Sequence, residues 1–533
     1  MNGVPLISLM LAMPALGVLG VIAGAGRDGA SARTIALLSS AVTFVISLLL
    51  WVGYEPAGAR FQFEEQVAWL PGFGISYHVG IDGISLLLIL LTTIFVPVAL
   101  AASGSSVDTR LREFASLVLV LQFAILGALV ALDLFVFYIF FELMLVPTFL
   151  LVGVWGGERR VAAAMRFFLF TMVGSVAMLV GMIALGTSKG TFDYVGLIDA
   201  LGKPGGSIGA ATAMWLFVAF TLAFAIKVPL VPLHSWLPEA YVQAPVSVTV
   251  LMSSVMVKVG TYGFLRFSIG LFPGAAQEAA SAVALLATLG IVYGALVAAK
   301  QRDLKRLVAY SSISHLGFVM LGLVAGTTEA VQGGVIQMVN HGVSTGALFL
   351  MAGMLNERAR TWAIAHFGGL ARVMPVFAAL LVLVTGTVAD RFDRKKVVFI
   401  AQVESHEPIR AFFRSGERRA AHASGIGKAL LAEMPASVVE RVVREHGLPA
   451  YTAATITEPA RFVGELAAIR ARGRSQPGLI ARLRRRPGRS MRRAIACSLG
   501  WIVPSSLRRH VMRSSAGRPI CARTRTPVSP SRA

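Results

Sequence analysis

Charged residues and cysteines are both scarce in this chain of 533 residues, and each scarcity excludes a class of protein. Only 14% of the side chains are charged, whereas 56% are hydrophobic, so the chain cannot all fold around one water-soluble core. The only two cysteines, Cys497 and Cys521, lie near the C-terminus, which excludes a disulfide framework or a paired-cysteine metal site in the hydrophobic part. The composition therefore predicts a polytopic membrane protein.

Basic charge is confined to the end of the chain. Residues 1–386 hold 20 Lys and Arg against 17 Asp and Glu, a net charge of +3, while residues 387–533 hold 29 against 10, a net charge of +19. The overall charge of +22 is therefore not a nucleic-acid footprint of the whole protein, and we expect no nucleic-acid partner.

Eleven apolar stretches are each long enough to cross a bilayer, which takes about 20 residues. The first has no basic segment ahead of it and no cleavage site that stands out, so we expect a retained helix and not a signal peptide. A twelfth stretch begins near residue 373 and fails by about residue 386. The eleven spans are expected near residues 4–24, 34–54, 81–102, 113–132, 134–154, 163–186, 211–235, 245–269, 276–299, 307–326 and 331–355.

Loop charges predict the orientation of these spans, because cytoplasmic loops are enriched in Lys and Arg. The loops after odd-numbered helices hold 14 of these residues up to residue 386, and the opposite side holds only four, namely Arg60, Lys189, Lys203 and Arg266. This alternation predicts an outside N-terminus. The remaining two, Lys227 and Lys258, are expected inside the membrane.

Three ionisable residues lie within apolar spans: Glu142, Lys227 and Lys258. A lysine at the centre of a membrane helix costs about 2.5 to 3.5 kcal/mol, and such residues usually face a partner charge or an ion path. We therefore interpret the three as sites of proton transfer. Two alternatives stay open, namely that Lys227 snorkels from a helix end to the interface and that one static ion pair holds the helices together.

Prolines interrupt the segment between helices seven and eight, at positions 229, 232, 238 and 245 around His234. Broken helices survive at membrane depth where neighbouring groups satisfy the freed carbonyls, and in transporters they mark ion paths. For Pro238 and Pro245 an ordinary loop at the membrane surface is the simpler expectation. Further along, His315 and His341 lie on successive helices and are candidates for a proton relay or for ordinary hydrogen-bonding partners.

Three motifs carry a resemblance to a known family. Residues 226–245 (IKVPLVPLHSWLPEAYVQAP), 302–318 (RDLKRLVAYSSISHLGF) and 140–147 (FFELMLVP) resemble the antiporter-like subunits of respiratory complex I, a proton-pumping NADH:quinone oxidoreductase. The resemblance covers about residues 1–384. It implies an all-α antiporter-like bundle of fourteen helices with two inverted five-helix repeats, each containing a broken helix.

The same resemblance implies roles for particular residues and partners. Glu142 and Lys227 match a coupled pair, Lys258 matches a central lysine, and His315 and His341 match relay positions. Subunits of this family belong to an oxidoreductase complex but carry out no redox chemistry themselves, so FMN, iron–sulfur clusters and quinone are expected in partner subunits. Neighbouring antiporter-like subunits and the lipid bilayer are the expected partners, in the bacterial inner membrane.

Two departures from the family pattern are visible. Tyr241 stands where many relatives have a histidine, at a position expected near the membrane surface. After residues 380–385 (LLVLVT) the pattern stops, where relatives continue with a broken twelfth helix that carries an ionisable residue, and then with two further helices. The second repeat is therefore expected to be truncated, without the residue that would form the proton exit.

The remainder of the chain is soluble in character. Residues 394–410, 421–431 and 448–457 resemble part of the effector domain of IclR-type transcription regulators, so we expect a partial α/β fragment over residues 387–472 that is too small for a stable core. Residues 473–533 are rich in arginine and are expected to be disordered. Alternative readings of the chain are a cation/proton antiporter subunit, a membrane-bound hydrogenase subunit, a transcription regulator and a non-functional fusion.

Overall fold

The computed structural model describes residues 4–24, 29–105, 107–203 and 208–367 of the hydrophobic part. Beyond these it describes residues 374, 377, 428, 431–432, 436–450 and 456–475. The chain divides into two compact units, residues 1–409 and residues 410–533. Apart from residues 374 and 377, the expected twelfth stretch near residues 373–386 lies outside the described residues, as does the basic tail beyond residue 475.

All eleven predicted membrane spans are present as helices long and apolar enough to cross a bilayer. The prediction of an all-α polytopic fold is therefore confirmed for the membrane part. Two of the spans are made of several segments, described below. The nine others, one of which consists of α5 and α6, are α1 (Leu6–Gly24), α2 (Ala30–Gly53), α3 (Gly83–Ala102), α4 (Leu111–Val130), α5 (Leu134–Leu143) with α6 (Leu145–Trp155), α7 (Arg160–Lys189), α13 (Pro273–Lys300), α14 (Leu304–Val324) and α15 (Thr328–Ala359).

Polar side chains set the start of several of these helices. The carboxylates of Asp82, Asp133 and Asp303 accept hydrogen bonds from backbone N–H groups in the first turns of α3, α5 and α14. The hydroxyl of Thr327 does the same for α15. Because the first N–H groups of a helix have no partner within it, these side chains fix where each span begins.

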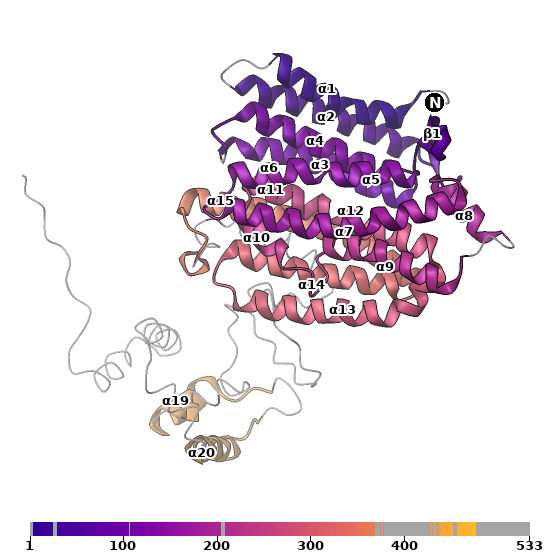
Figure 1. Ribbon diagram of the computed structural model, residues 1–533. Helices are drawn as coiled ribbons and strands as arrows, with labels where there is room; N and C mark the ends of the chain where they lie inside the picture. Colours follow the sequence, from indigo (N-terminus) through magenta and orange to yellow (C-terminus); the bar gives the residue numbers. More distant parts are fainter. Residues whose placement is uncertain are drawn as a thin grey trace, which may run out of the picture. The chain divides into compact units, whose positions relative to one another are not determined.

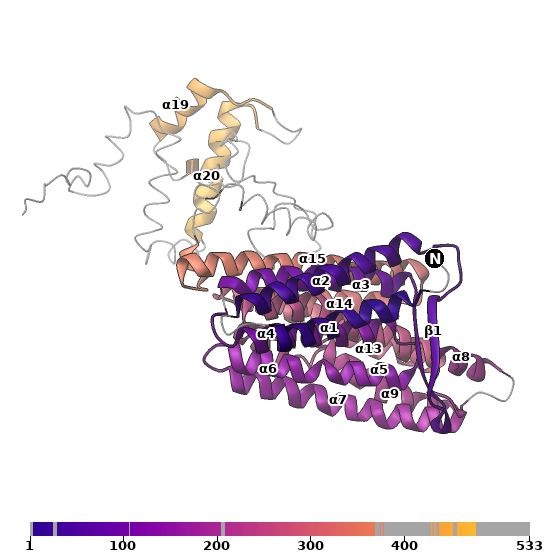
Figure 2. The same ribbon diagram turned by 90° about the horizontal axis from the view of Figure 1, so that it is seen from above.

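The membrane helices lie side by side in one bundle (Figure 1). The bundle runs from α1 and α2 on one side to α13 and α14 on the other, and β1 and the short helix α8 (Tyr194–Gly202) lie together at one end in both views (Figures 1 and 2). That end is the predicted outer face, because the loops that contain them follow even-numbered spans. The buried groups described below lie within this bundle.

A β-hairpin at that end was not predicted from the sequence. Strands β1 (Gln62–Leu70) and β2 (Ile75–Ile81) pair in antiparallel register, with Gln66 opposite His78, and the turn between them contains Pro71–Phe73. The hairpin is short and partly polar, so it adds a small sheet to a helical fold without changing its class.

Span seven is broken, as the prolines predicted. Helix α9 (Ala210–Lys227) ends at Lys227, residues 228–235 form turns, and α10 (Trp236–Gln243) resumes the helical path. The indole N–H of Trp236 donates to the carbonyl of Ile226 over 2.8 Å, and the N–H of Leu230 donates to that of Ala225. These bonds satisfy carbonyls that the break frees, which is the requirement for irregular backbone at membrane depth.

Span eight alternates between α-helical and π-helical turns. It consists of α11 (Val246–Leu251), a π-helical segment Met252–Met256, α12 (Val257–Gly263) and a second π-helical segment Phe264–Ile269. Nearly all of it is buried in the bundle. Because π-helical turns are frequent at functional sites, this span is a candidate location for one.

The second unit contains two described helices, α19 (Ala436–His446) and α20 (Pro459–Ser475). They share a small apolar cluster made of Leu431, Ala432, Val439, Phe462 and Leu466. The expected α/β character and the domain boundaries at residues 386 and 472 remain predictions, since the strands expected there fall mostly outside the described residues.

Candidate functional site

Glu142 in span five and Lys227 in span seven interact electrostatically, and they form no ion pair within the described part of the chain. Glu142 lies two residues before Met144, where α5 gives way to α6, and it interacts electrostatically with Lys227 and with the hydroxyl of Ser175. Within the described part of the chain, Lys227 Nζ and Glu142 Oε1 have no hydrogen-bond partner, although both atoms are buried. A static ion pair that pins the helices is therefore not what the structure shows.

Lys227 is enclosed by protein and does not snorkel to the membrane surface. Its side chain is 1% exposed, and Nζ lies 4.7 Å from the ring centre of Phe141 and 6.0 Å from that of Phe167. Aromatic faces attract a cation, but less strongly than a carboxylate does. The ammonium group is therefore buried in a setting that tolerates its charge without fixing it to one partner.

Gly260 brings spans seven and eight into close contact at this point. A Cβ atom at position 260 would lie 2.9 Å from the Cβ of Lys227 and 3.0 Å from a methyl group of Val228. Only glycine permits this approach, because the neighbouring atoms belong to the stem of a side chain and to a buried valine. Since Lys258 precedes Gly260 by two residues, the glycine places the two lysine-bearing segments side by side.

Lys258, His341 and His315 form the other half of the cluster. Lys258 Nζ lies 2.7 Å from His341 Nδ1 and also donates to the carbonyl of Ser253 in the first π-helical segment. The rings of His341 and His315 meet edge to face, with centroids 5.6 Å apart. Lys258 and His341 are 1% and 0% exposed, and His341 Nε2 has no hydrogen-bond partner among the described residues.

The five predicted site residues thus fall into two neighbouring groups. Glu142 and Lys227 form the first group, and Lys258, His341 and His315 form the second. Gly260 joins the two groups through its contact with Lys227. No sequence pattern short of the family resemblance indicated this pairing, because the residues come from five different spans.

The segment around α10 is buried by the protein, and Pro238 lies within this helix, whereas an ordinary loop was expected at Pro238 and Pro245. Pro238, Tyr241 and Pro245 are all buried in the bundle. Tyr241 is 0% exposed, its ring packs edge to face against Phe349, and its hydroxyl has no partner within the described part.

Two further buried cations were counted with the loop charges, although one of them, Arg266, lies within the span predicted near residues 245–269. Arg266 belongs to span eight, is 6% exposed and pairs with Asp82 over 2.6 Å. Lys305 is 3% exposed and donates to the carbonyls of Val242 and Ala244 at the end of α10. The burial of Arg266 could have been predicted, because the apolar run around Lys258 continues to this residue. Lys305 lies at the start of a helix, where the neighbouring charged residues indicated a loop.

These two cations hold the ends of the irregular segments in place. The Arg266 guanidinium carbon lies 4.9 Å from the ring centre of Phe61 and 5.2 Å from that of Tyr262, and Asp82 caps α3. Lys305 satisfies carbonyls at the C-terminal end of α10, where the helix dipole favours a cation. Neither residue contacts the five site residues directly, so we assign both a positioning role.

His78 links the outer hairpin to the bundle. Its ring is buried between two carboxylates, with Nδ1 facing Asp193 and Nε2 3.0 Å from Glu64. Burial lowers the pKa of His78, but the hydrogen bonds and charges of Asp193 and Glu64 outweigh burial and raise it above 6.5. A nearby third carboxylate, Asp133, has a pKa that burial raises.

The His78 contacts predict a pH-dependent stability. Because the pKa is higher in the folded state, the stabilisation is complete below pH 6.5 and is lost as the pH rises through the folded-state value. His78→Gln should therefore reduce the thermal stability of the purified chain at pH 5.5 more than at pH 8.5 in differential scanning fluorimetry. An equal loss at both pH values would show that the ring acts by packing alone.

Among the residues that the structure describes, no group of three His, Cys, Asp or Glu side chains is placed to hold a metal ion. The five site residues instead combine one carboxyl group, two amines and two imidazoles, which are groups that exchange protons. The bundle, the broken span and the buried Glu/Lys/His cluster together define the class of antiporter-like membrane subunits.

Comparisons with known proteins agree with this class and identify one family within it. Residues 131–390 match the family described as NADH:quinone oxidoreductase/Mrp antiporter, TM. The NADH-quinone oxidoreductase subunit M of Rhodobacter capsulatus is 42% identical over 391 residues, which cover 71% of this chain and 76% of the relative. The chain therefore belongs to the subunit M family of NADH-quinone oxidoreductase, whose members are proton-translocating membrane subunits of respiratory complex I.

Solved structures show the same fold. A chain of respiratory complex I from Thermus thermophilus is 34% identical, with a TM-score of 0.65 over 72% of this chain and 78% of that one. A chain of the Mrp complex from Dietzia sp. is only 24% identical, with a TM-score of 0.62 over 72% of this chain and 40% of that one, so it supports the fold alone. The higher identity to subunit M disfavours the cation/proton antiporter alternative.

A second family follows directly along the chain. Residues 386–476 match the C-terminal part of the bacterial transcriptional regulator IclR. This match meets the end of the membrane family match, which reaches residue 390. The predicted resemblance of this segment to an IclR effector domain is therefore confirmed.

Proposed function

We propose that protons cross the chain along Glu142, Lys227, Lys258, His341 and His315. The contact of 2.7 Å between Lys258 Nζ and His341 Nδ1 carries this proposal, because it places a proton donor against an acceptor inside the membrane. A structural hydrogen bond alone would not explain the unpartnered buried atoms of Lys227, Glu142 and His341. Intramembrane ionisable residues of this kind commonly form proton relays.

Each group has a distinct role in the proposed transfer. The ammonium of Lys258 passes a proton to His341 Nδ1, and the imidazole releases its other proton from Nε2, with His315 as the next acceptor. Lys227, held next to span eight by Gly260, supplies the next proton through a water molecule or by movement of its flexible stem. Glu142 interacts electrostatically with Lys227, so in this proposal a change of charge at Glu142 moves the proton on Lys227.

The redox chemistry of the complex belongs, in this proposal, to other subunits. The groups of the cluster exchange protons and present no set of ligands for a metal ion within the described residues. We propose that FMN, iron–sulfur clusters and quinone are held by partner subunits, and that this chain acts as the translocating part. Neighbouring antiporter-like membrane subunits and the bilayer lipids are its partners.

The proposed location is the bacterial inner membrane with the N-terminus outside. The distribution of Lys and Arg supports this orientation even after Arg266 is moved into a span and Lys305 is recognised as buried, since the excess stays on the side of the loops after odd-numbered helices. The outer end then carries the hairpin and α8, and the inner end carries α10.

We further propose that the chain lacks the outer part of the proton path. The membrane family match stops where the IclR match begins, so the broken twelfth helix that the family implies is replaced by regulator sequence. The domain organisation is then residues 1–386, 387–472 and 473–533. The non-functional fusion remains the alternative to a working subunit.

A complementation experiment tests this proposal. In a strain that lacks subunit M, the chain is compared with a chimera in which residues from 386 onward are replaced by the matching C-terminal part of the Rhodobacter capsulatus subunit. We expect the chimera to restore NADH-driven proton uptake into everted vesicles and the chain as it stands to fail. Equal proton uptake by both would show that the missing helix is dispensable, and an assembled chimera without proton uptake would contradict the proposed path.

A further inference from the structure

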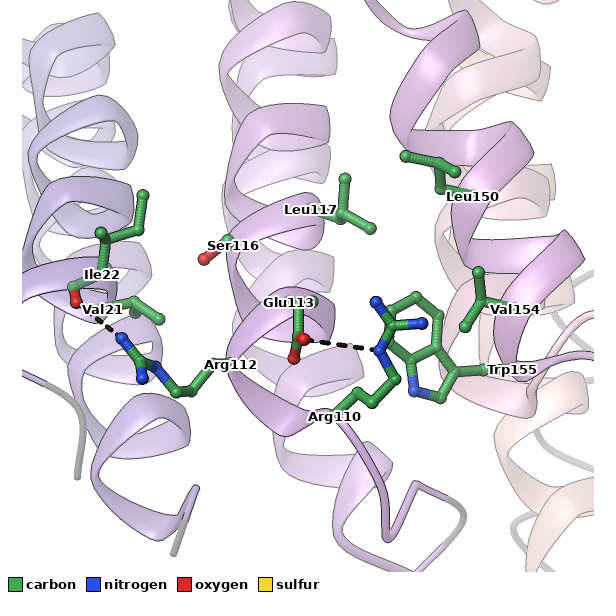
Figure 3. Close-up of a pocket in the computed structure, with 10 residues that line it drawn as sticks. All are labelled: Val21, Ile22, Arg110, Arg112, Glu113, Ser116, Leu117, Leu150, Val154 and Trp155. Carbon is green, nitrogen blue, oxygen red and sulfur yellow. Dashed lines mark hydrogen bonds and ion pairs between the residues drawn. The ribbon is translucent and has the colours of Figure 1, made fainter. Parts of the chain in front are cut away.

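A cavity of about 480 Å³ lies between α1, α4 and α6, at the end of the bundle where α4 begins (Figure 3). It is separate from the Glu/Lys/His cluster, and none of the five site residues lines it. We propose that it binds an anionic phospholipid, with the phosphate at the arginines and one acyl chain along the apolar wall. The residues that line it are Val21, Ile22, Arg110, Arg112, Glu113, Ser116, Leu117, Leu150, Val154 and Trp155.

Two arginines stand at the mouth of this cavity with N–H groups available. Arg110 is 59% exposed and reaches Glu113 only through Nε, over a long contact of 3.4 Å. Arg112 donates from one terminal nitrogen to the carbonyl of Ile22 over 2.7 Å. Both guanidinium groups therefore keep N–H donors for a phosphate, and their two positive charges exceed the single negative charge of Glu113 (Figure 3).

Apart from the hydroxyl of Ser116, the wall beyond the arginines is apolar. Leu117 lies seven residues after Arg110, which places it about 10 Å deeper along α4 at 1.5 Å per residue. Leu150 and Val154 of α6 face the same space in Figure 3, and Val21 and Ile22 close it on the side of α1. This arrangement of a charged mouth and an apolar depth matches a lipid that enters from the bilayer.

Trp155 marks the level of the membrane interface. Its indole N–H donates to the carbonyl of Thr109 over 2.8 Å, and the Arg110 guanidinium carbon lies 5.9 Å from its ring centre. Tryptophan is enriched where hydrocarbon meets headgroups, so the arginines lie at headgroup depth. Basic pockets between helices on the cytoplasmic side are typical sites for anionic lipids.

Charge and shape together favour an anionic phospholipid over other occupants. A free phosphate would leave the apolar wall uncovered, and a zwitterionic lipid would gain less from two arginines. The face lies on the predicted cytoplasmic side, where anionic headgroups meet the excess of Lys and Arg. A helix of a neighbouring subunit would bring no charge to the arginines unless it carried acidic residues there.

Lipid retention by the full chain tests the proposal. The chain is reconstituted into vesicles of equal parts phosphatidylglycerol and phosphatidylcholine, extracted in a mild detergent, and its bound lipids are counted by native mass spectrometry. We expect phosphatidylglycerol to be retained in preference, and Arg110→Gln with Arg112→Gln to reduce this preference at least about fivefold. The matched control is Arg302→Gln with Arg306→Gln, which removes two exposed arginines from the same side and should leave retention unchanged.

A second variant tests the apolar wall of the cavity separately from the charge of its arginines. Leu117→Trp fills the apolar wall but keeps both arginines, so it should lower the retention of phosphatidylglycerol although the charge is unchanged. Equal retention by the arginine variant and its control, or equal retention of the two lipids by the unaltered chain, would overturn the proposal. So would a photoreactive residue at position 154 that links to a polypeptide, and not to lipid, in the assembled complex.

Discussion

Lys258→Met in the chimera is expected to lower NADH-driven proton uptake into everted vesicles by about tenfold or more, equivalent to at least about 1.4 kcal/mol on the transfer barrier. Methionine has nearly the length of lysine and suits a buried position, so the helix should still pack. What is lost is the ammonium that contacts His341 Nδ1 and the Ser253 carbonyl. The loss should appear in proton uptake and not in the amount of assembled complex.

Lys300→Met is the matched control for this variant. Lys300 is the exposed last residue of α13. Its replacement by methionine removes the same charge as Lys258→Met does. We expect the control to pump at the rate of the unaltered chimera. If Lys258→Met pumps as well as Lys300→Met does, the contact with His341 is structural.

Gly260→Ala is expected to destabilise the membrane domain by about 1 to 3 kcal/mol, the usual cost of overpacking a tight interior. The added Cβ would meet the Lys227 Cβ at 2.9 Å, so spans seven and eight have to separate. That separation moves Lys227 away from Lys258, and proton uptake should fall together with the thermal midpoint. The measurements are unfolding of the purified chain by fluorimetry and proton uptake by the chimera.

Gly333→Ala is the control for the glycine. Gly333 lies within α15, and a Cβ there would meet no atom within 4 Å. Alanine at this site should leave stability unchanged or raise it by about 0.4 to 1 kcal/mol. Equal thermal midpoints for the two alanine variants would show that the contact at Gly260 is not tight.

The sequence predicted the membrane spans well because their signal is local. Each span is a run of apolar residues with few charges, so all eleven were placed from hydropathy, and Lys227 and Lys258 were recognised as intramembrane charges by their neighbours. The break after Lys227 was also predictable, since proline lacks the N–H that a helix needs. These features depend on residues close together in the chain.

Features that depend on distant residues were missed. The pairing of Arg266 with Asp82 joins spans three and eight, and the burial of Lys305 depends on carbonyls of α10 more than sixty residues earlier. The hairpin and its His78 contacts likewise required a partner at Asp193, and Tyr241 is buried by Phe349. Hydropathy places charges at the ends of apolar runs in loops, and only the packed bundle shows which of them are enclosed.

The path itself could not be read from spacing. Glu142, Lys227, Lys258, His315 and His341 come from five spans, and the family resemblance alone suggested that they belong together. The structure places Lys258 Nζ next to His341 Nδ1, and it shows that Gly260 allows Lys227 to pack closely against span eight. The roles of these residues remain a proposal that rests on this geometry.

The number of protons translocated per NADH oxidised, measured for the Lys258→Met chimera beside the Lys300→Met chimera, tests the proposed path most directly. If protons cross through Lys258, the ratio falls for Lys258→Met while assembly is retained, and the control keeps the ratio of the unaltered chimera. An undiminished ratio for Lys258→Met would contradict the account, because protons would then reach the other side without the buried lysine.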